Sequence, residues 1–228
     1  MGEQIQVELQ SWMGSDREIA EAAWTSSSDL VKKQARTEED VARIVNMLAD
    51  LKHSVPFESV VFRFWIRLPI AIDRQHMTHR IASHSGMSGR YRTMPSDFLA
   101  MPDDICDILA SCEMEHIEEE YNKLCTAAND WYTANMASFK SLRDDGKLQN
   151  QDYKRVREFL RGPLPQHNMT ERVTVMNLRS FANYYKLRAK ADAQPEIQQI
   201  ADQMYAAIVK KDVCPIAFDS LAKNNWVI

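Results

Sequence analysis

The sequence lacks any long apolar run. Nowhere do about 18 apolar residues follow one another, which is the length that a membrane-spanning helix needs. The opening residues, MGEQIQVELQSWMG, carry neither a basic flank nor the apolar core of a secretory signal peptide. We therefore expect a cytoplasmic protein that makes no contact with a membrane.

Cysteine is scarce, and so are patterns of metal ligands. The cysteines are Cys106, Cys112, Cys125 and Cys214. They show neither the paired spacing of a zinc site nor the density of a disulfide scaffold, which predicts reduced thiols. His76 and His79 are three residues apart and could share a metal, but no carboxylate or thiol pattern completes a site. We expect no metal.

An excess of positive charge is also missing, because the formal net charge is −4. The protein as a whole does not attract a polyanion, so nucleic acid is not expected as a partner. With 45% hydrophobic residues in 228 positions, the chain can bury a full core. No repeat, low-complexity tract or linker divides it, which predicts one domain over residues 1–228.

The hydrophobic period alternates between that of strands and that of helices. A period of two predicts strands over residues 4–10 and 60–67. Capping patterns predict helices that open at Ser15 and Thr37, and a helix from Ile70 that leads into a loop at residues 84–91. Further helical patterns cover residues 103–142, 151–160, 178–190 and 195–211. We predict the α+β class, with one sheet partly wrapped by helices and long helices in the C-terminal half.

The most unusual stretch is RQHMTHRIASHSGMSGRYR, residues 74–92, with four arginines, three histidines, three serines and two glycines. Gly86 and Gly89 allow a tight loop whose backbone N–H groups can converge on an anion. Arg80, Arg90 and Arg92 can form charge-assisted hydrogen bonds to phosphate. Taken alone, these residues favour a solvated surface, because arginine clusters at surfaces are more often solvated than functional.

This stretch resembles the signature of the flavin-dependent thymidylate synthases, an Arg-His-Arg motif followed by a Ser and a closing Ser-x-Arg-Tyr. The resemblance extends to three other blocks, HSVPFESVVFRFWIRLPI, LRGPLP and NLRSFANYYKLRAKADAQPEIQQIA, and to CPIAF near the end. Agreement at separated blocks with intact spacing is more specific than any single motif.

The resemblance implies an enzyme that binds FAD and methylates carbon 5 of the uracil ring of dUMP, giving dTMP. It implies NADPH as reductant and 5,10-methylenetetrahydrofolate as carbon donor. It also implies a homotetramer in which several subunits share each active site.

The resemblance also assigns roles to residues. Arg188 would be catalytic, because a guanidinium beside uracil stabilises the ring ionised at N3 and directs electron density to carbon 5. The expected nucleotide-binding residues are Gln75, Met87, Ser88, Gly89, Arg90, Arg161 and Arg188. The expected flavin-binding residues are His53, Thr78, His79, Arg80, Asn177, Arg179 and Asn183. Without the resemblance, Asn183 and Arg179 would be interpreted as a helix cap and a solvated charge.

The sequence departs from the family pattern at several positions. Thr78 stands where the first arginine of the motif is usual, and Ser85 and Gly86 stand where Asn-Glu is usual. Val55 replaces a common hydroxyl residue, and Trp24 replaces an arginine. These changes leave two alternatives open: action on another pyrimidine nucleotide, as a UMP methylase or nucleotide hydroxymethylase, or a non-catalytic flavin- or nucleotide-binding relative.

Overall fold

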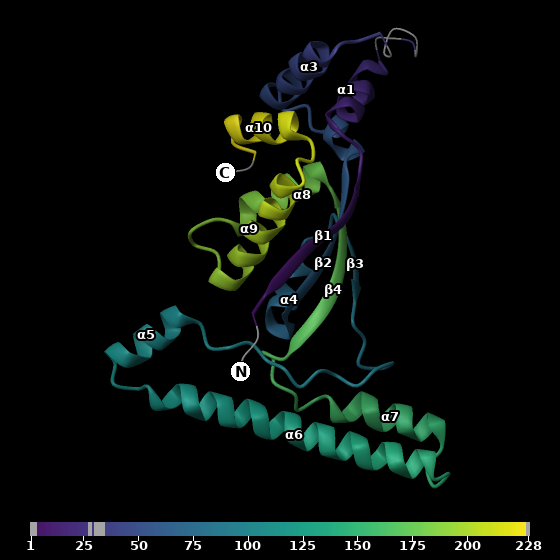
Figure 1. The fold of residues 1–228 in the computed structure, drawn as a ribbon, viewed down its shortest axis with the longest axis vertical. Coiled ribbons are helices and arrows are strands. Elements are labelled where there is room, and N and C mark those ends of the chain that lie inside the picture. The colour runs from purple at the N-terminus through teal and green to yellow at the C-terminus, as the bar shows by residue number, and fades with distance from the viewer. Residues whose placement is uncertain (1–3, 27–28, 30–34, 227–228) are drawn as a thin grey trace. The chain divides into compact units, whose positions relative to one another are not determined.

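The computed structural model describes residues 4–26, 29 and 35–226 (Figure 1). The chain divides into two compact units. The first unit comprises Met1–Ile5, Arg67–Arg74 and Gly86–Glu171, and the second comprises Gln6–Ile66, Gln75–Ser85 and Arg172–Ile228. These stretches alternate along the chain, so neither unit is a continuous segment, and one domain over residues 1–228 stays a prediction.

A four-stranded sheet has the strand order β1-β2-β4-β3. Its strands are β1 (Gln6–Met13), β2 (Val61–Pro69), β3 (Ser83–Gly86) and β4 (Met169–Asn177). In β2 every second side chain is buried, including Phe62, Phe64 and Ile66, so this strand supplies much of the core. The strands β1 and β2 confirm the predicted segments, whereas β3 and β4 were not predicted.

The second unit covers its part of the sheet with helices. They are α1 (Asp16–Trp24), α3 (Glu38–Asp50), α8 (Leu178–Arg188), α9 (Pro195–Lys210) and α10 (Pro215–Lys223), with a 3₁₀ turn η1 (Val55–Ser59). Helix α9 packs against β1, and α8 packs against α9 and η1. The ring of Phe181 on α8 lies 5.9 Å from that of Phe62 and 6.3 Å from that of Phe64. The predicted helix starts are confirmed, since Ser15 and Thr37 cap α1 and α3.

The first unit is built on α5 (Asp103–Ser111), α6 (His116–Asp144) and α7 (Asn150–Leu160). Helices α6 and α7 lie side by side (Figure 1) around a small core that contains Tyr132, Met136 and Tyr153. The prediction of one helical pattern over residues 103–142 is wrong, because the helix is interrupted between Ser111 and His116. Glu113 there has a left-handed backbone with φ of 57°. Neither glycine nor proline marks this break in the sequence.

Helix α4 (Ile70–His76) is shorter than predicted. Its end is fixed by Thr78, whose hydroxyl donates to the carbonyl of Gln75 at 2.7 Å. Residues Ser83–Gly86 then join the sheet as β3 instead of continuing a helix or loop. The α+β class with one sheet and surrounding helices is confirmed. In the described part of the chain, no helix is both long and apolar enough to cross a membrane.

Candidate functional site

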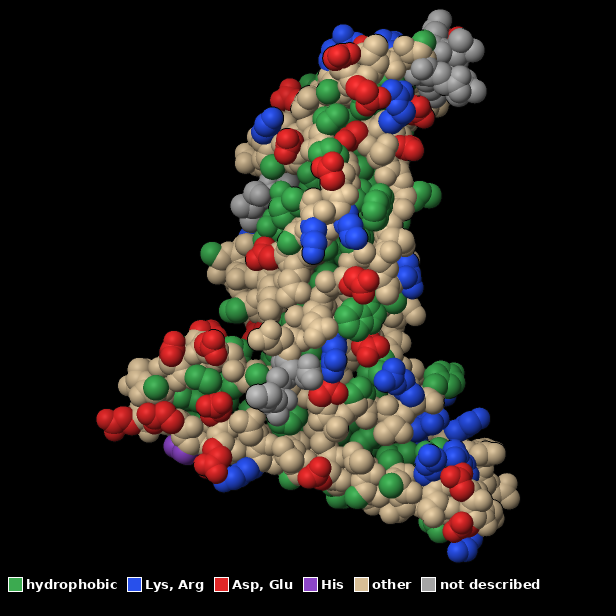
Figure 2. All heavy atoms as spheres, in the orientation of Figure 1, with side chains coloured by type: hydrophobic (Ala, Val, Ile, Leu, Met, Phe, Trp, Pro, Cys, Tyr) green, Lys and Arg blue, Asp and Glu red, His purple; other side chains and the backbone are tan. Residues whose placement is uncertain are grey.

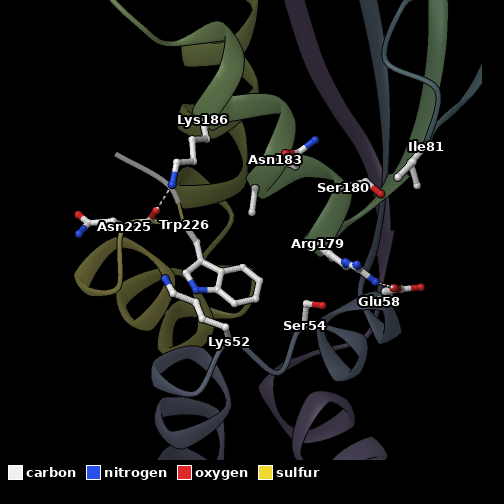
Figure 3. A pocket seen from close by; sticks show the side chains of 11 residues that line it. Lys52, Ser54, Glu58, Ile81, Arg179, Ser180, Asn183, Lys186, Asn225 and Trp226 are labelled. Atoms are coloured by element: carbon white, nitrogen blue, oxygen red, sulfur yellow. Dashed lines mark hydrogen bonds and ion pairs between the residues drawn. The ribbon is translucent and has the colours of Figure 1, made fainter.

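A pocket of about 610 Å³ opens in the second unit, between the start of α8, the segment before η1 and the segment after α10 (Figure 3). Its lining is Lys52, Ser54, Glu58, Ile81, Arg179, Ser180, Ala182, Asn183, Lys186, Asn225 and Trp226. Arg179 and Asn183, two of the predicted flavin contacts, are among them. The cationic side chains of Lys52, Arg179 and Lys186 outnumber the carboxylate of Glu58, which favours an anionic ligand.

The first turn of α8 positions the predicted flavin contacts. Asn177 is the N-cap, and its side-chain oxygen accepts from the backbone N–H of Ser180 at 2.8 Å. The Asn177 side chain is therefore engaged in capping α8. Arg179 forms an ion pair with Glu58 at 2.5 Å, and Asn183 is exposed at the pocket one turn later. Arg179 and Asn183 are thus the members of this group that face the pocket.

The remaining predicted flavin contacts differ in exposure. His79 is 8% exposed, and burial lowers its pKa although a hydrogen bond to the backbone of Ser180 acts in the opposite direction. Its Nε2 is buried and has no hydrogen-bond partner among the described residues. His53 and Arg80 are exposed, and His53 lies between Lys52 and Ser54 of the pocket wall. These side chains are available to a ligand.

The guanidinium of Arg188, the predicted catalytic group, is held at the last turn of α8. Its Nη2 donates to the hydroxyl of Thr78 at 3.0 Å and to the carbonyl of Gln75 at 3.4 Å. Thr78 thus orients Arg188 at the position where the family pattern has an arginine. The Nε of Arg188 and the Oε1 of Gln75 are buried and have no partner among the described residues. A buried polar atom without a partner destabilises a protein by about 1–3 kcal/mol, so both atoms point to a ligand.

A chain of buried and half-buried hydrogen bonds begins at His76, which is 0% exposed. Its Nδ1 is 2.9 Å from the hydroxyl of Tyr184 and its Nε2 is 3.0 Å from the hydroxyl of Thr174. Nδ1 of His84 is 3.2 Å from the same threonine hydroxyl, and Nε2 of His84 is 3.3 Å from the carbonyl of His79. The chain joins α4, β3, β4 and α8.

The carbonyl of His79 determines the directions of these hydrogen bonds, because it is the one group in the chain that cannot donate. Nε2 of His84 therefore donates to it, and in the tautomer with its proton on Nε2 the Nδ1 of His84 accepts from Thr174. Thr174 therefore accepts from Nε2 of His76, and Nδ1 of His76 accepts from the phenol of Tyr184. Burial lowers the pKa of His76 to about 3 and raises that of Tyr184, so both remain neutral, as this order requires. The chain ends on the backbone of His79 and fixes its position.

A second pocket, of about 360 Å³, lies in the first unit. It contains the predicted nucleotide contacts Met87, Gly89 and Arg161, together with Arg74. Gly89 packs closely against two side chains, since a Cβ there would lie 2.9 Å from the sulfur of Met94 and 3.0 Å from the side chain of Arg161 and would displace their ends. The absence of a side chain at Gly89 leaves room for the Arg161 guanidinium at the pocket wall.

The loop beside this pocket is held by its own residues. The Ser88 hydroxyl accepts from the backbone N–H of Arg90 at 3.3 Å, and Arg90 pairs with Glu158 at 2.8 Å. Arg157 donates to the carbonyls of Arg90 and Tyr91. Ser88 and Arg90 thus already have protein partners that shape the loop, whereas Gly89 and Arg161 line the pocket itself.

Acidic side chains gather over α5 and the start of α6, and basic side chains gather over α7 and the loop after β3 (Figure 2). The acidic end includes the hollow lined by Glu115, Glu118, Glu119 and Asp130. These carboxylates outnumber the one ammonium in that hollow, that of Lys123, which disfavours a phosphate there. Within the first unit, the arginine-lined pocket at Gly89 is therefore the candidate for an anionic ligand.

The structure divides the predicted site residues between the two units. The second unit brings together Gln75, Thr78 and Arg188, and places Arg179 and Asn183 at its pocket. The first unit brings together Met87, Gly89 and Arg161. The lining residues Lys52, Lys186, Asn225 and Trp226 were not predicted from the sequence, and neither were the buried partners Thr174 and Tyr184. The β-period of residues 169–177 could have indicated Thr174, whereas no local pattern indicates the others.

Comparison with protein families gives a match to the family described as thymidylate synthase complementing protein, over residues 8–216. A flavin-dependent thymidylate synthase of Thermosipho melanesiensis is 31% identical over 216 residues, which are 94% of this chain and 89% of the relative. Another, of Pseudothermotoga lettingae, is 32% identical over 221 residues, or 96% of this chain and 91% of the relative.

Solved structures with a similar fold include a UMP/dUMP methylase from Streptomyces cacaoi. Its complex with 5-Br dUMP has a TM-score of 0.73 and 21% identity, and the match covers 99% of this chain and 98% of that one. Its complex with 5-Br UMP has a TM-score of 0.73 and 23% identity, with 100% and 97% covered. At these identities the similarity shows a shared fold.

Proposed function

Since the chain belongs to the thymidylate synthase complementing protein family, we propose that it is a flavin-dependent thymidylate synthase. It methylates dUMP to dTMP, with 5,10-methylenetetrahydrofolate as carbon donor and NADPH as reductant. The observation that carries this proposal is the set of buried unpartnered polar atoms on Gln75, His79 and Arg188. The family pattern assigns these three residues to ligands, and ligands that complete their hydrogen bonds explain the unpartnered atoms.

The pocket of the second unit fits FAD in its chemistry. Lys52, Arg179 and Lys186 provide positive charge for a diphosphate, and the Asn183 amide can donate and accept. His79 offers a buried imidazole nitrogen, and His53 and Arg80 are exposed for contact. FAD held by these residues would supply the hydride, taken from NADPH, that completes the methyl group. The volume of about 610 Å³ is within the range of cofactor sites.

Arg188 prepares the nucleotide for reaction. Its guanidinium stabilises the uracil ring ionised at N3, and the added electron density at carbon 5 makes that carbon the nucleophile. Thr78 and the carbonyl of Gln75 hold the guanidinium in one orientation, which reduces the reorganisation needed during reaction. No cysteine nucleophile is needed for this activation.

The pocket of the first unit is the candidate site for a nucleotide phosphate. Arg161 and Arg74 outnumber the carboxylate of Asp73 there, and Gly89 keeps the wall open. Ser88 and Arg90 contribute by shaping the loop that contains Gly89. The assignment agrees with the basic surface over α7 (Figure 2).

The active form in this proposal is a homotetramer whose subunits share active sites. Large apolar side chains near the candidate sites support assembly, because Val55 is 68% exposed, Ile81 is 66% exposed and Tyr91 is 80% exposed. Sedimentation of the purified protein tests this part, and a monomer that turns over dUMP would contradict it.

The flavin spectrum tests the proposal. We expect a yellow protein whose flavin absorbance is bleached by NADPH without oxygen and returns when 5,10-methylenetetrahydrofolate and dUMP are added. A protein that takes up no FAD would overturn the proposal. Bleaching without recovery on addition of folate and nucleotide would instead identify a binding protein that has lost methyl transfer.

A further inference from the structure

Trp226 forms one wall of the pocket in the second unit and comes from the segment that follows α10 (Figure 3). This segment lies outside residues 8–216, which match the family. Trp226 is therefore a feature of this chain that the family pattern does not assign to any role.

The segment is tied to the pocket by both neighbouring elements. Lys52 donates to the carbonyl of Asn224, and Lys186 donates to the carbonyl of Asn225 at 2.7 Å. The backbone N–H of Trp226 donates to the carbonyl of Leu221 at 2.9 Å. Because both lysines also line the pocket, the wall that Trp226 forms is built into the site.

The indole ring has a fixed orientation. It packs against the buried ring of Phe57 with the ring centres 5.6 Å apart and an angle of 48° between the planes. The ammonium of Lys52 lies 5.4 Å from the centre of the indole ring. An aromatic ring held in this way loses little conformational entropy when a ligand packs against it.

The indole Nε1 is buried and has no hydrogen-bond partner among the described residues. An indole N–H can only donate, and a buried Trp usually has an acceptor. The pocket wall thus combines an aromatic surface, a donor without an acceptor, and cationic side chains. A nucleotide cofactor supplies the complementary groups: a flat ring, ring acceptors and phosphate.

We propose that Trp226 is a binding residue for FAD, which packs one of its ring systems against the indole and accepts a hydrogen bond from Nε1. This inference rests on the proposed function, because it takes FAD as the ligand of this pocket. It adds to that function a contact from the C-terminal segment, which makes the segment a determinant of cofactor affinity.

Dissociation constants for FAD test the inference with flavin-free protein of the wild type, Trp226→Leu and Trp226→Phe. Loss of the aromatic surface and the donor in Trp226→Leu weakens FAD binding by about tenfold or more. Trp226→Phe keeps the ring and loses only the donor, so its loss is about three- to tenfold. Trp12→Leu is the matched control, since Trp12 is 45% exposed and does not line the pocket.

Separate titrations with FMN and ADP identify the ring. A loss confined to ADP places the adenine at Trp226, and a loss confined to FMN places the isoalloxazine there. Circular dichroism melting of each variant shows that the fold is intact, and Trp226→Phe provides the test if Trp226→Leu does not fold.

The possible failures are distinct. If the wild type binds FAD and both Trp226 variants bind it within twofold of the wild type, the inference is overturned while the proposed function stands. If the wild type binds no FAD, the proposed function is overturned and the inference falls with it. Equal weakening in Trp12→Leu would show that the effect is not specific to the pocket and would also overturn the inference.

Discussion

The hydroxyl of Tyr184 lies 2.9 Å from Nδ1 of His76, and both side chains are fully buried. This contact begins a sequence of hydrogen bonds that ends on the carbonyl of His79. It connects the packing of α8 on the sheet to the position of a residue that we assign to flavin binding. The interior of the second unit therefore bears directly on the geometry of the site.

Replacement of Thr174 by valine tests this connection. Valine has nearly the same shape but no hydroxyl, so Nε2 of His76 and Nδ1 of His84 both lose their partner. We expect the free energy of unfolding to fall by about 1–3 kcal/mol in urea denaturation and the affinity for FAD to decrease. Thr174→Ser keeps the hydroxyl, so its free energy of unfolding and its affinity for FAD should stay close to those of the wild type. A valine variant as stable as the wild type would show that the hydrogen bonds are unimportant.

The stability of the protein should depend on pH through His76. Burial lowers the pKa of this residue from 6.5 to about 3. Between about pH 6.5 and pH 3, His76 is therefore protonated in the unfolded chain but neutral in the folded protein. The free energy of unfolding therefore falls as the pH decreases through this window, by about 1.4 kcal/mol per unit, and His76 has no effect above it.

Urea denaturation at about pH 7.5 and 5.5 measures this contribution. The wild type should lose about 1.4 kcal/mol more than His76→Gln between the two values, because the variant has no imidazole at this position. His116→Gln serves as the control, since His116 is exposed. If the free energy of unfolding had the same pH dependence in the wild type and in His76→Gln, His76 would not be the source of the pH dependence.

Arg188→Ala should retain FAD and its reduction by NADPH while methyl transfer is abolished, because the guanidinium acts on the nucleotide. Thr78→Val removes the acceptor at 3.0 Å and should reduce turnover by about tenfold. Stopped-flow reduction and turnover assays separate the two steps. Near wild-type turnover of Arg188→Ala would exclude Arg188 as the catalytic residue.

Restoration of the family arginine should not improve this protein. In Thr78→Arg a second guanidinium would take the place of the hydroxyl that accepts from Arg188, and the two like charges would repel. We expect weaker dUMP binding and slower turnover than in the wild type. Tighter dUMP binding in Thr78→Arg would show that position 78 serves the phosphate rather than Arg188.

Gly89→Ala should weaken nucleotide binding without unfolding the protein. The added Cβ would collide with the ends of the Met94 and Arg161 side chains, which can move, so Arg161 is displaced from the pocket. We expect the dissociation constant for dUMP to rise by about tenfold in calorimetry. Gly146→Ala is the control, because its Cβ meets no atom within 4 Å, although its φ of 73° carries some strain. An unchanged dUMP affinity in Gly89→Ala would show that Arg161 does not bind dUMP.

Local patterns in the sequence predicted the elements whose residues carry their own signals. Thr37 and Asp40 form the capping box that opens α3, and the alternation in β2 matches its buried face. The break at Glu113 was not predictable, because the left-handed backbone there involves no glycine. Residues 83–86 form a strand only because β4 lies beside them, which is a long-range contact.

The site could be predicted only in part, because local motifs mark some of its residues and long-range packing brings in the others. Arg188 and Gln75 lie in motifs that resemble the family, and the structure brings them within hydrogen-bonding distance of one another. Trp226 and Lys52 are 174 positions apart, and only the fold brings them together at the pocket. The role of Thr78 as a partner of Arg188 likewise depends on the packing of α8 and could not be read from its position in the motif.

Product analysis with dUMP, UMP and dCMP side by side tests the proposed function most directly. The purified protein, supplied with FAD, NADPH and 5,10-methylenetetrahydrofolate, should convert dUMP to dTMP, identified by chromatography and mass spectrometry, and Arg188→Ala should give none. Methylation of UMP in preference to dUMP, a hydroxymethylated product, or no product from any of the three nucleotides would contradict the proposal.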